Sequence, residues 1–95
     1  MLEAVKTALR ITDNEFDAEV QGLIDASIGD LRLAGIDPAK IVESDAFARQ
    51  TVITYCKAHF GYDNEEAPRF SESYDGMKRS MALSSLYRAD GGVVA

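Results

Sequence analysis

Hydrophobic residues recur along most of the chain at intervals of three and four, which places them on one face of an α-helix. No stretch before the C-terminal end alternates convincingly with the period of two that indicates a strand. The pattern predicts four helices, over residues 2–9, 13–34, 45–60 and 68–84. The predicted fold is therefore all-α, with about four helices, two of them long and antiparallel, in a single domain over residues 1–95.

The second predicted helix carries signals at both of its ends. Thr12 and Glu15 fit a capping box, in which each side chain satisfies a backbone N–H group at the start of the helix. Gly35 suits the left-handed position just beyond the end of the helix. Pro38 then allows at most a short helical turn before the third helix.

The later boundaries are marked in the same way. Ser44 or Asp45 can cap the third helix, Gly61 can stop it, and Pro68 suits the first turn of the fourth. Beyond the fourth helix the period is lost. We therefore expect residues 83–95 to form an extended arm that is mobile while the protein is alone.

Composition narrows the function classes. The formal net charge is -6 and the sequence pI is about 4.6. This acidic balance argues against a nucleic-acid-binding surface, whose affinity comes mainly from neutralising phosphates. Nothing approaches the roughly 18 consecutive apolar residues of a membrane span, and the N-terminus lacks the basic start and apolar run of a signal peptide. The single cysteine leaves no partner for an internal disulfide and fits a reducing compartment.

The chain's only histidine raises the question of a chemical site. His59 follows Cys56 by three residues on one helical face and precedes Asp63, Glu65 and Glu66. A zinc site needs three or four ligands at defined spacing, and no second histidine or cysteine completes one. A Cys–His nucleophile would also need an orienting group and an oxyanion hole. We interpret the histidine as a partly buried residue at a helix end and the cysteine as a small buried hydrophobe.

The fourth predicted helix has a stripe of large residues. Phe70, Tyr74, Met77 and Met81 follow each other at helical spacing. Core packing is the favoured interpretation, and a partner surface is the alternative, because aromatic and methionine side chains are enriched in interfaces.

A series of packing and turn residues spans the third and fourth predicted helices. It comprises Tyr55-Cys56-Lys57, Phe60-Gly61-Tyr62-Asp63-Asn64, Arg69-Phe70, Ser73-Tyr74 and Leu83-Ser84-Ser85. The front of the chain adds a short Leu-rich helix, LRIT, Phe16-Asp17 and the LRLAGI end of the second helix. In this order and spacing, over nearly the whole chain, the sequence resembles the head–tail connector family of long-tailed bacteriophages, also called DNA-packaging or head-completion adaptor proteins.

The resemblance implies a structural role without catalytic residues, metal or cofactor. Subunits would form a ring beneath the portal protein of the filled capsid, extend the DNA channel and offer a surface to a neck or tail-completion protein. DNA would pass through without specific binding, along a partly acidic wall that repels phosphates. The protein would be made in the cytoplasm of the bacterial host and reside in the neck of the virion, with no membrane contact.

Two groups of residues follow as site candidates. The inter-subunit or portal interface is expected to include Tyr62, Arg69, Met77, Leu83, Leu86, Tyr87 and Arg88. The corner between the third and fourth helices is expected to be packed by Phe60, Gly61, Tyr62, Phe70 and Tyr74. The arm over residues 83–95 is expected to become ordered only on assembly, by docking on a neighbour or on the portal.

Two other classes of function stay open at this point. One is a small acidic helical regulatory module that binds a defined protein partner, such as an antitoxin or a transcription co-factor. The other is a small enzyme with a carboxylate-based metal site, which metal-dependent thermal stabilisation would reveal.

Overall fold

The computed structural model describes residues 1–61 and 64–90, and its regular structure is helical. The elements are α1 (Leu2–Leu9), α2 (Asp17–Leu33), the 3-10 turn η1 (Pro38–Lys40), α3 (Ala46–His59) and α4 (Ala67–Leu83). Within the described ranges, the extended pairing consists of one isolated antiparallel bridge between Ile36 and Arg88. The prediction of an all-α fold with four helices is confirmed.

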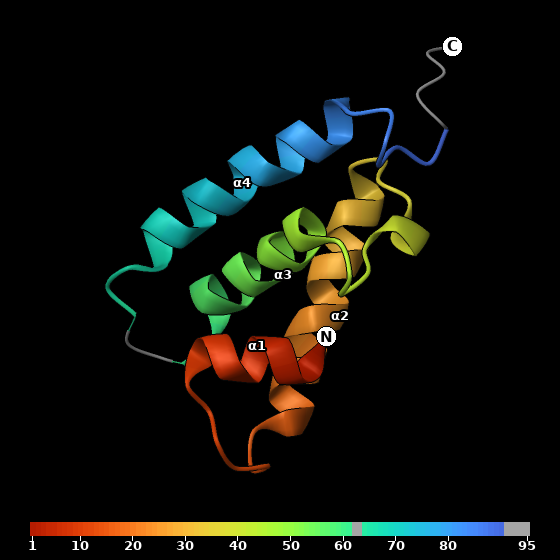
Figure 1. The fold of residues 1–95 in the computed structure, drawn as a ribbon. Coiled ribbons are helices and arrows are strands. Elements are labelled where there is room, and N and C mark those ends of the chain that lie inside the picture. Colours follow the sequence, from red (N-terminus) through yellow and green to blue (C-terminus); the bar gives the residue numbers. More distant parts are fainter. Residues whose placement is uncertain (62–63, 91–95) are drawn as a thin grey trace.

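Helix α3 lies at the centre of the arrangement, and α1, α2 and α4 all contact it (Figure 1). Helix α4 follows α3 after a short connection and runs beside it in the opposite direction, as expected for an antiparallel pair. Helix α1 packs against both α2 and α3. The C-terminal ends of α2 and α4 come together at one end of the molecule, where residues 84–90 also lie (Figure 1).

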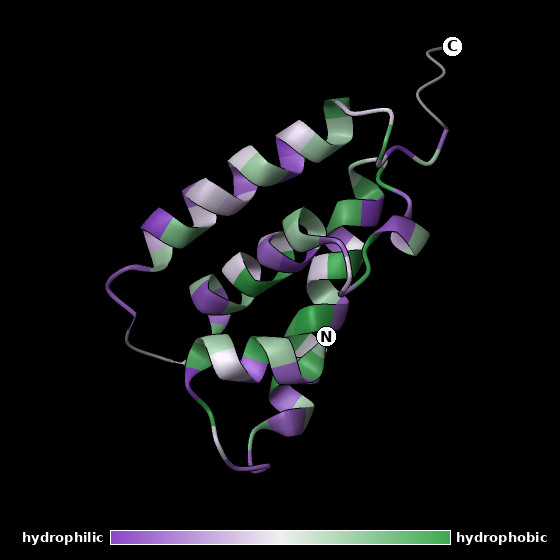
Figure 2. Cartoon of the chain, viewed as in Figure 1, coloured by the Kyte–Doolittle hydropathy of each residue, from purple (hydrophilic) through white to green (hydrophobic). Residues whose placement is uncertain are grey.

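The hydrophobic core takes side chains from every helix and from the connection between α2 and α3. Its buried members are Val5, Val20, Ile24, Leu31, Ile36, Ile41, Ala48, Val52, Ile53, Cys56, Tyr74 and Met81. Figure 2 shows strongly hydrophobic stretches on α2 and a largely polar or weakly hydrophobic α4. Helix α4 therefore covers the core with one stripe and leaves its remaining surface to solvent.

Helix α3 also buries two threonines without leaving their hydroxyl groups unpaired. Thr51 Oγ1 donates to the carbonyl of Phe47 at 2.8 Å, and Thr54 Oγ1 donates to the carbonyl of Gln50 at 2.8 Å. Each hydroxyl thus bonds to the preceding turn of its own helix, so burial carries no lost hydrogen bond. Helix α3 can therefore lie at the centre of the core although its buried residues include two threonines.

The end of α2 forms a complete Schellman motif around Gly35, whose φ is +93°. The N–H of Ile36 donates to the Leu31 carbonyl at 3.1 Å, and the N–H of Gly35 donates to the Arg32 carbonyl at 3.0 Å. Ile36 and Leu31 are both fully buried, which supplies the hydrophobic contact that accompanies this motif. The predicted role of Gly35 is confirmed, and the motif turns the chain towards η1.

Helix α3 begins and ends at predicted residues. The Asp45 carboxylate accepts hydrogen bonds from the backbone N–H groups of Phe47 and Ala48, both at 3.0 Å. Of the two candidates for the cap, Asp45 is therefore the one that acts. Gly61, with a φ of +88°, follows the end of the helix, and Pro68 lies in the first turn of α4.

The predicted capping box of α2 is wrong. The helix begins at Asp17 rather than Asp13, and its N-cap residue, Phe16, makes no side-chain cap. The Lys6 ammonium lies 2.7 Å from an Asp17 carboxylate oxygen and donates to Asn14 Oδ1 at 2.9 Å. The hydrogen bond to Asp17 raises the pKa of Lys6 against the opposing effect of burial. Lys6, eight residues before Asn14, thus holds the segment before α2 in a turn. A search for capping residues near the helix start does not detect such a contact.

The segment after α4 makes hydrogen bonds with its own chain. The N–H of Asp37 donates to the Tyr87 carbonyl at 2.8 Å, and the N–H of Ala89 donates to the Gly35 carbonyl at 2.9 Å. These bonds flank the Ile36–Arg88 bridge. The segment 84–90 therefore has a docking place on its own chain, whereas the remainder of the predicted arm, residues 91–95, lies outside the described residues.

We expect replacement of Asp45 by alanine to lower the free energy of unfolding by about 1–2 kcal/mol, because α3 loses its N-cap. The substitution Asp45→Asn is the matched control, since asparagine caps helices about as well as aspartate. Urea denaturation of both variants measures the difference. Equal stability of the alanine and asparagine variants would show that the cap does not support the fold.

Candidate functional site

The two candidate reactive residues, Cys56 and His59, lie in different environments. The Cys56 side chain is fully buried, and this burial raises the pKa of its thiol to about 12. Its fraction of thiolate at neutral pH is therefore negligible. His59, which was expected to be partly buried, is exposed at the end of α3 and stacks on Tyr55, with a ring-centroid distance of 4.2 Å. Among residues 1–61 and 64–90, no three His, Cys, Asp or Glu side chains are grouped so that they could hold a metal ion.

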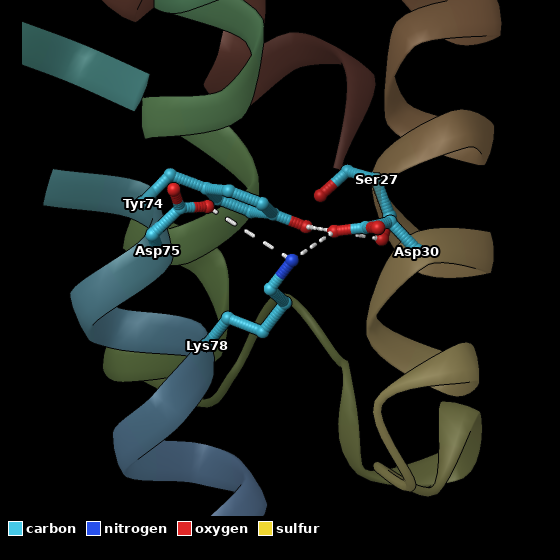
Figure 3. Close-up of polar contacts among 5 residues, drawn as sticks. All are labelled: Ser27, Asp30, Tyr74, Asp75 and Lys78. Atoms are coloured by element: carbon cyan, nitrogen blue, oxygen red, sulfur yellow. Dashed lines mark hydrogen bonds and ion pairs between the residues drawn. The ribbon is translucent and has the colours of Figure 1, made fainter. Parts of the chain in front are cut away.

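A polar cluster joins α4 to α2 (Figure 3). The Tyr74 hydroxyl donates to an Asp30 carboxylate oxygen at 2.8 Å, and the Lys78 ammonium donates to the same oxygen at 3.0 Å. Asp75 lies 3.9 Å from the Lys78 ammonium on the solvent side. Tyr74 and Lys78 stand one helical turn apart on α4, so both side chains reach across to one carboxylate of α2.

The electrostatics of this cluster favour an ionised Asp30. Burial opposes the charge, but the hydrogen bonds from Tyr74 and Lys78 outweigh it and lower the pKa of the Asp30 carboxyl. Burial, together with the neighbouring carboxylate, raises the pKa of Tyr74 well above its ordinary value. The tyrosine therefore stays a donor and the aspartate stays an acceptor across the neutral range.

Two clefts border this region. One, of about 220 Å³, is lined by Asp30, Tyr55, Ala58, His59, Ser71, Tyr74, Asp75 and Lys78. The other, of about 490 Å³, is lined by Phe16, Glu19, His59, Phe60 and Gly61. The first cleft contains two carboxylates, Asp30 and Asp75, and both lie beside the Lys78 ammonium, at 3.0 and 3.9 Å. The polar cluster beside the first cleft serves to fasten α4.

The described residues that were predicted to pack the corner between α3 and α4 have different neighbours. The Phe60 ring meets Phe16 edge-on at 5.6 Å, and Phe70 lies under the cations of Arg69 at 5.1 Å and Lys57 at 5.7 Å. Tyr74 is buried between α2 and α3, where its ring also contacts Tyr55 at 5.0 Å. Tyr62 lies outside the described residues.

The predicted interface residues have diverse environments. Leu83 and Leu86 are 77% and 72% exposed, and Met77 is half-buried. Arg69 is exposed and pairs with Glu66 at 2.8 Å, while Arg88 pairs with Asp90 at 2.6 Å. Of the stripe on α4, Tyr74 and Met81 are buried and Phe70 is half-buried, so the stripe is mainly a core element.

Tyr87 is anchored within its own chain. Its hydroxyl donates to the Asp45 carboxylate at 2.9 Å, and its ring lies 6.2 Å from that of Phe47. The backbone hydrogen bond from Ala48 and the bond from Tyr87 lower the pKa of the Asp45 carboxyl, against an opposing effect of burial. The N-cap of α3 thus doubles as the acceptor that holds the segment 84–90.

The sequence analysis missed two features of this surface. Asp30 was not predicted to have a partner, because it lies off the hydrophobic stripe of α2. Its position close to Ile28 and Leu31 indicated that it borders the buried face. Leu33 is 84% exposed at the last position of α2. Leu33, Leu83 and Leu86 thus belong to the three segments that come together at one end of the molecule (Figure 1).

The fold and the site define a small helical protein with a fastened C-terminal segment and exposed leucines near the ends of α2 and α4. The sequence matches the family described as Phage connector protein over residues 1–88, and the chain belongs to that family. It is accordingly a structural connector of the phage particle, which contacts other phage head or tail proteins. Comparison with curated proteins and with solved structures gives no match. No described helix is both long and apolar enough to cross a membrane.

We expect the substitution Tyr74→Phe to lower the free energy of unfolding at pH 7 by about 1 kcal/mol, because Asp30 loses one of its two donors. The difference from the native protein should shrink as the pH falls below about 4. An aspartate with a lowered pKa contributes its stability above the unfolded-state pKa and loses it as the pH falls through the folded-state value. Denaturant titrations between pH 7 and pH 3 measure both effects.

The substitution Tyr55→Phe is the control, because the Tyr55 hydroxyl makes no hydrogen bond to another residue of the described ranges. A loss of stability in the Tyr74 variant that stays constant down to pH 3 would contradict the assigned role of Asp30.

Proposed function

We propose that this connector closes into a ring beneath the portal protein, extends the DNA channel and presents a surface to a neck or tail-completion protein. Membership of the phage connector family carries this proposal. The proposal goes beyond family membership in three respects, which are the ring, the portal contact and the position in the neck of the virion. In this role the chain contributes shape and adhesion, and the environments of Cys56 and His59 favour no catalysis.

Ring closure by rotation requires two different patches on each subunit that fit each other. One patch is proposed to contain the exposed leucines near the C-terminal ends of α2 and α4, which are Leu33, Leu83 and Leu86. Interfaces have apolar cores with polar rims, and a leucine exposed by more than 70% gains free energy when a neighbour covers it. Leu83 and Leu86 are proposed as the centre of this patch, with Met77, Tyr87 and Arg88 near them. Arg69, in the first turn of α4, extends the proposed interface to the other end of that helix. The proposed interface also includes Tyr62, which lies outside the described residues.

The charge of the chain fits a DNA channel that must not bind its contents. The net charge of -6 is large for 95 residues, and a ring multiplies it by the number of subunits. A wall of like charge repels phosphates and keeps DNA free to slide. Exposed acidic residues such as Glu19 and Asp25 on α2 are candidates for the lumen.

The double substitution Leu83→Asp and Leu86→Asp should weaken self-association by at least about tenfold, because an interface would have to bury two carboxylates in place of two leucines. The monomer should keep its thermal stability, since both side chains are exposed in the single chain. Sedimentation velocity over a concentration series measures the association.

The control is Ala18→Asp, an equally drastic change at an exposed position in the first turn of α2, away from the leucines. It should leave association unchanged. The interface assignment would be wrong if the control and the double variant weakened association equally, or if neither had an effect.

A further inference from the structure

The segment 84–90 is held by one short stretch of the chain, residues 35–45, and its Tyr87 ring also packs beside Phe47. Two backbone hydrogen bonds, from Asp37 N–H to Tyr87 and from Ala89 N–H to Gly35, form the bridge. The Lys40 ammonium donates to the Leu86 carbonyl at 3.1 Å, and the Tyr87 hydroxyl donates to Asp45. These contacts form a self-contained docking site, which we call the 35–45 site.

The connection between α4 and this bridge is a tight turn. The N–H groups of Tyr87 and Arg88 donate to the Ser84 carbonyl at 3.1 and 3.2 Å, and the N–H of Leu86 donates to Ser84 Oγ at 3.2 Å. Ser84 already has extended dihedral angles, with φ -96° and ψ 129°. Leu83, which precedes the turn, and Leu86, which lies within it, are both exposed, so the closed form of the turn keeps two large apolar side chains in solvent.

We propose that, in the assembled ring, the turn opens and the segment 84–90 of each subunit occupies the 35–45 site of its neighbour. This exchange rests on the proposed function, because it needs identical copies side by side. Every contact that a subunit loses within its own chain is regained with the next copy, so exchange carries little net loss of contacts. The opened turn then lies between two subunits, where Leu83 and Leu86 can be covered.

The chemistry of the site selects a second copy as the occupant. The bridge hydrogen bonds are made by backbone groups and would accept many extended segments. The acceptor of the Tyr87 hydroxyl, however, is the Asp45 carboxylate, and the Tyr87 ring also packs beside Phe47. The identical segment of a neighbouring copy brings its Tyr87 to this carboxylate in the same register. Because the subunits of a ring are related by rotation, every site around the ring is then filled by the next copy.

The bridge geometry allows a direct test. Ile36 and Arg88 form a non-hydrogen-bonded antiparallel pair, because the flanking residues make the hydrogen bonds. The Cα atoms of such pairs are about 4.5 Å apart, within the range that a disulfide spans. We would prepare Ile36→Cys and Arg88→Cys as separate chains in a Cys56→Ala background, with a size tag on one, then mix, assemble and oxidise them.

Exchange predicts a disulfide between the two chains, at high yield, in the assembled fraction. A chain that carries both substitutions should form the disulfide within itself when monomeric and between chains when assembled. Pairing Arg88→Cys with Ala18→Cys controls for random collision and should give little product. Because Ile36 is buried, a second pair of variants at exposed positions, Lys40→Cys and Leu86→Cys, is joined with a short bismaleimide as a check.

The outcomes separate the inference from the function on which it rests. Assembled rings that yield only disulfides within single chains would overturn exchange and leave the ring proposal standing. A protein that stays monomeric at every concentration, both alone and mixed with the portal protein, and yields no disulfide between chains would overturn both.

Discussion

The burial of α3 is the constraint on which the rest of the structure depends. Seven of its residues are buried, and each of the other three helices packs against it. A helix covered on so many sides must satisfy its polar groups internally, as Thr51 and Thr54 do by bonding to the preceding turn. It must also begin at a defined residue, and Asp45 sets that start. The placement of α1, α2 and α4 then follows from their hydrophobic faces.

Two tyrosine–carboxylate pairs fasten the C-terminal third of the chain to α2 and to the start of α3. Tyr74 of α4 donates to Asp30 of α2, and Tyr87 of the segment 84–90 donates to Asp45 at the start of α3. Both carboxyls have lowered pKa values, so both acceptors are charged at neutral pH and both bonds are strengthened by that charge. In the single chain, these two bonds hold the last helix and its extension in a defined orientation.

The sequence predicted those features that depend on neighbouring residues. Helical periodicity located the four helices, and Gly35 and Asp45 were identified by the local chemistry of helix ends. The start of α2 was misplaced, because a salt bridge from Lys6 overrides the capping signal of Thr12 and Glu15. The hydrogen bond from Tyr74 to Asp30 was not predicted, because the two residues are 44 positions apart and no local pattern connects them. The docking of residues 87–89 was missed because backbone hydrogen bonds leave no pattern in side chains.

Family membership and this architecture lead to one central claim, that copies of the chain close into a ring. Sedimentation over a concentration series, with negative-stain images of any large species, tests the claim most directly. The account predicts a discrete large species whose images are closed rings with a central opening and one subunit number. A monomer or dimer at every concentration, both alone and mixed with the portal protein, would contradict it.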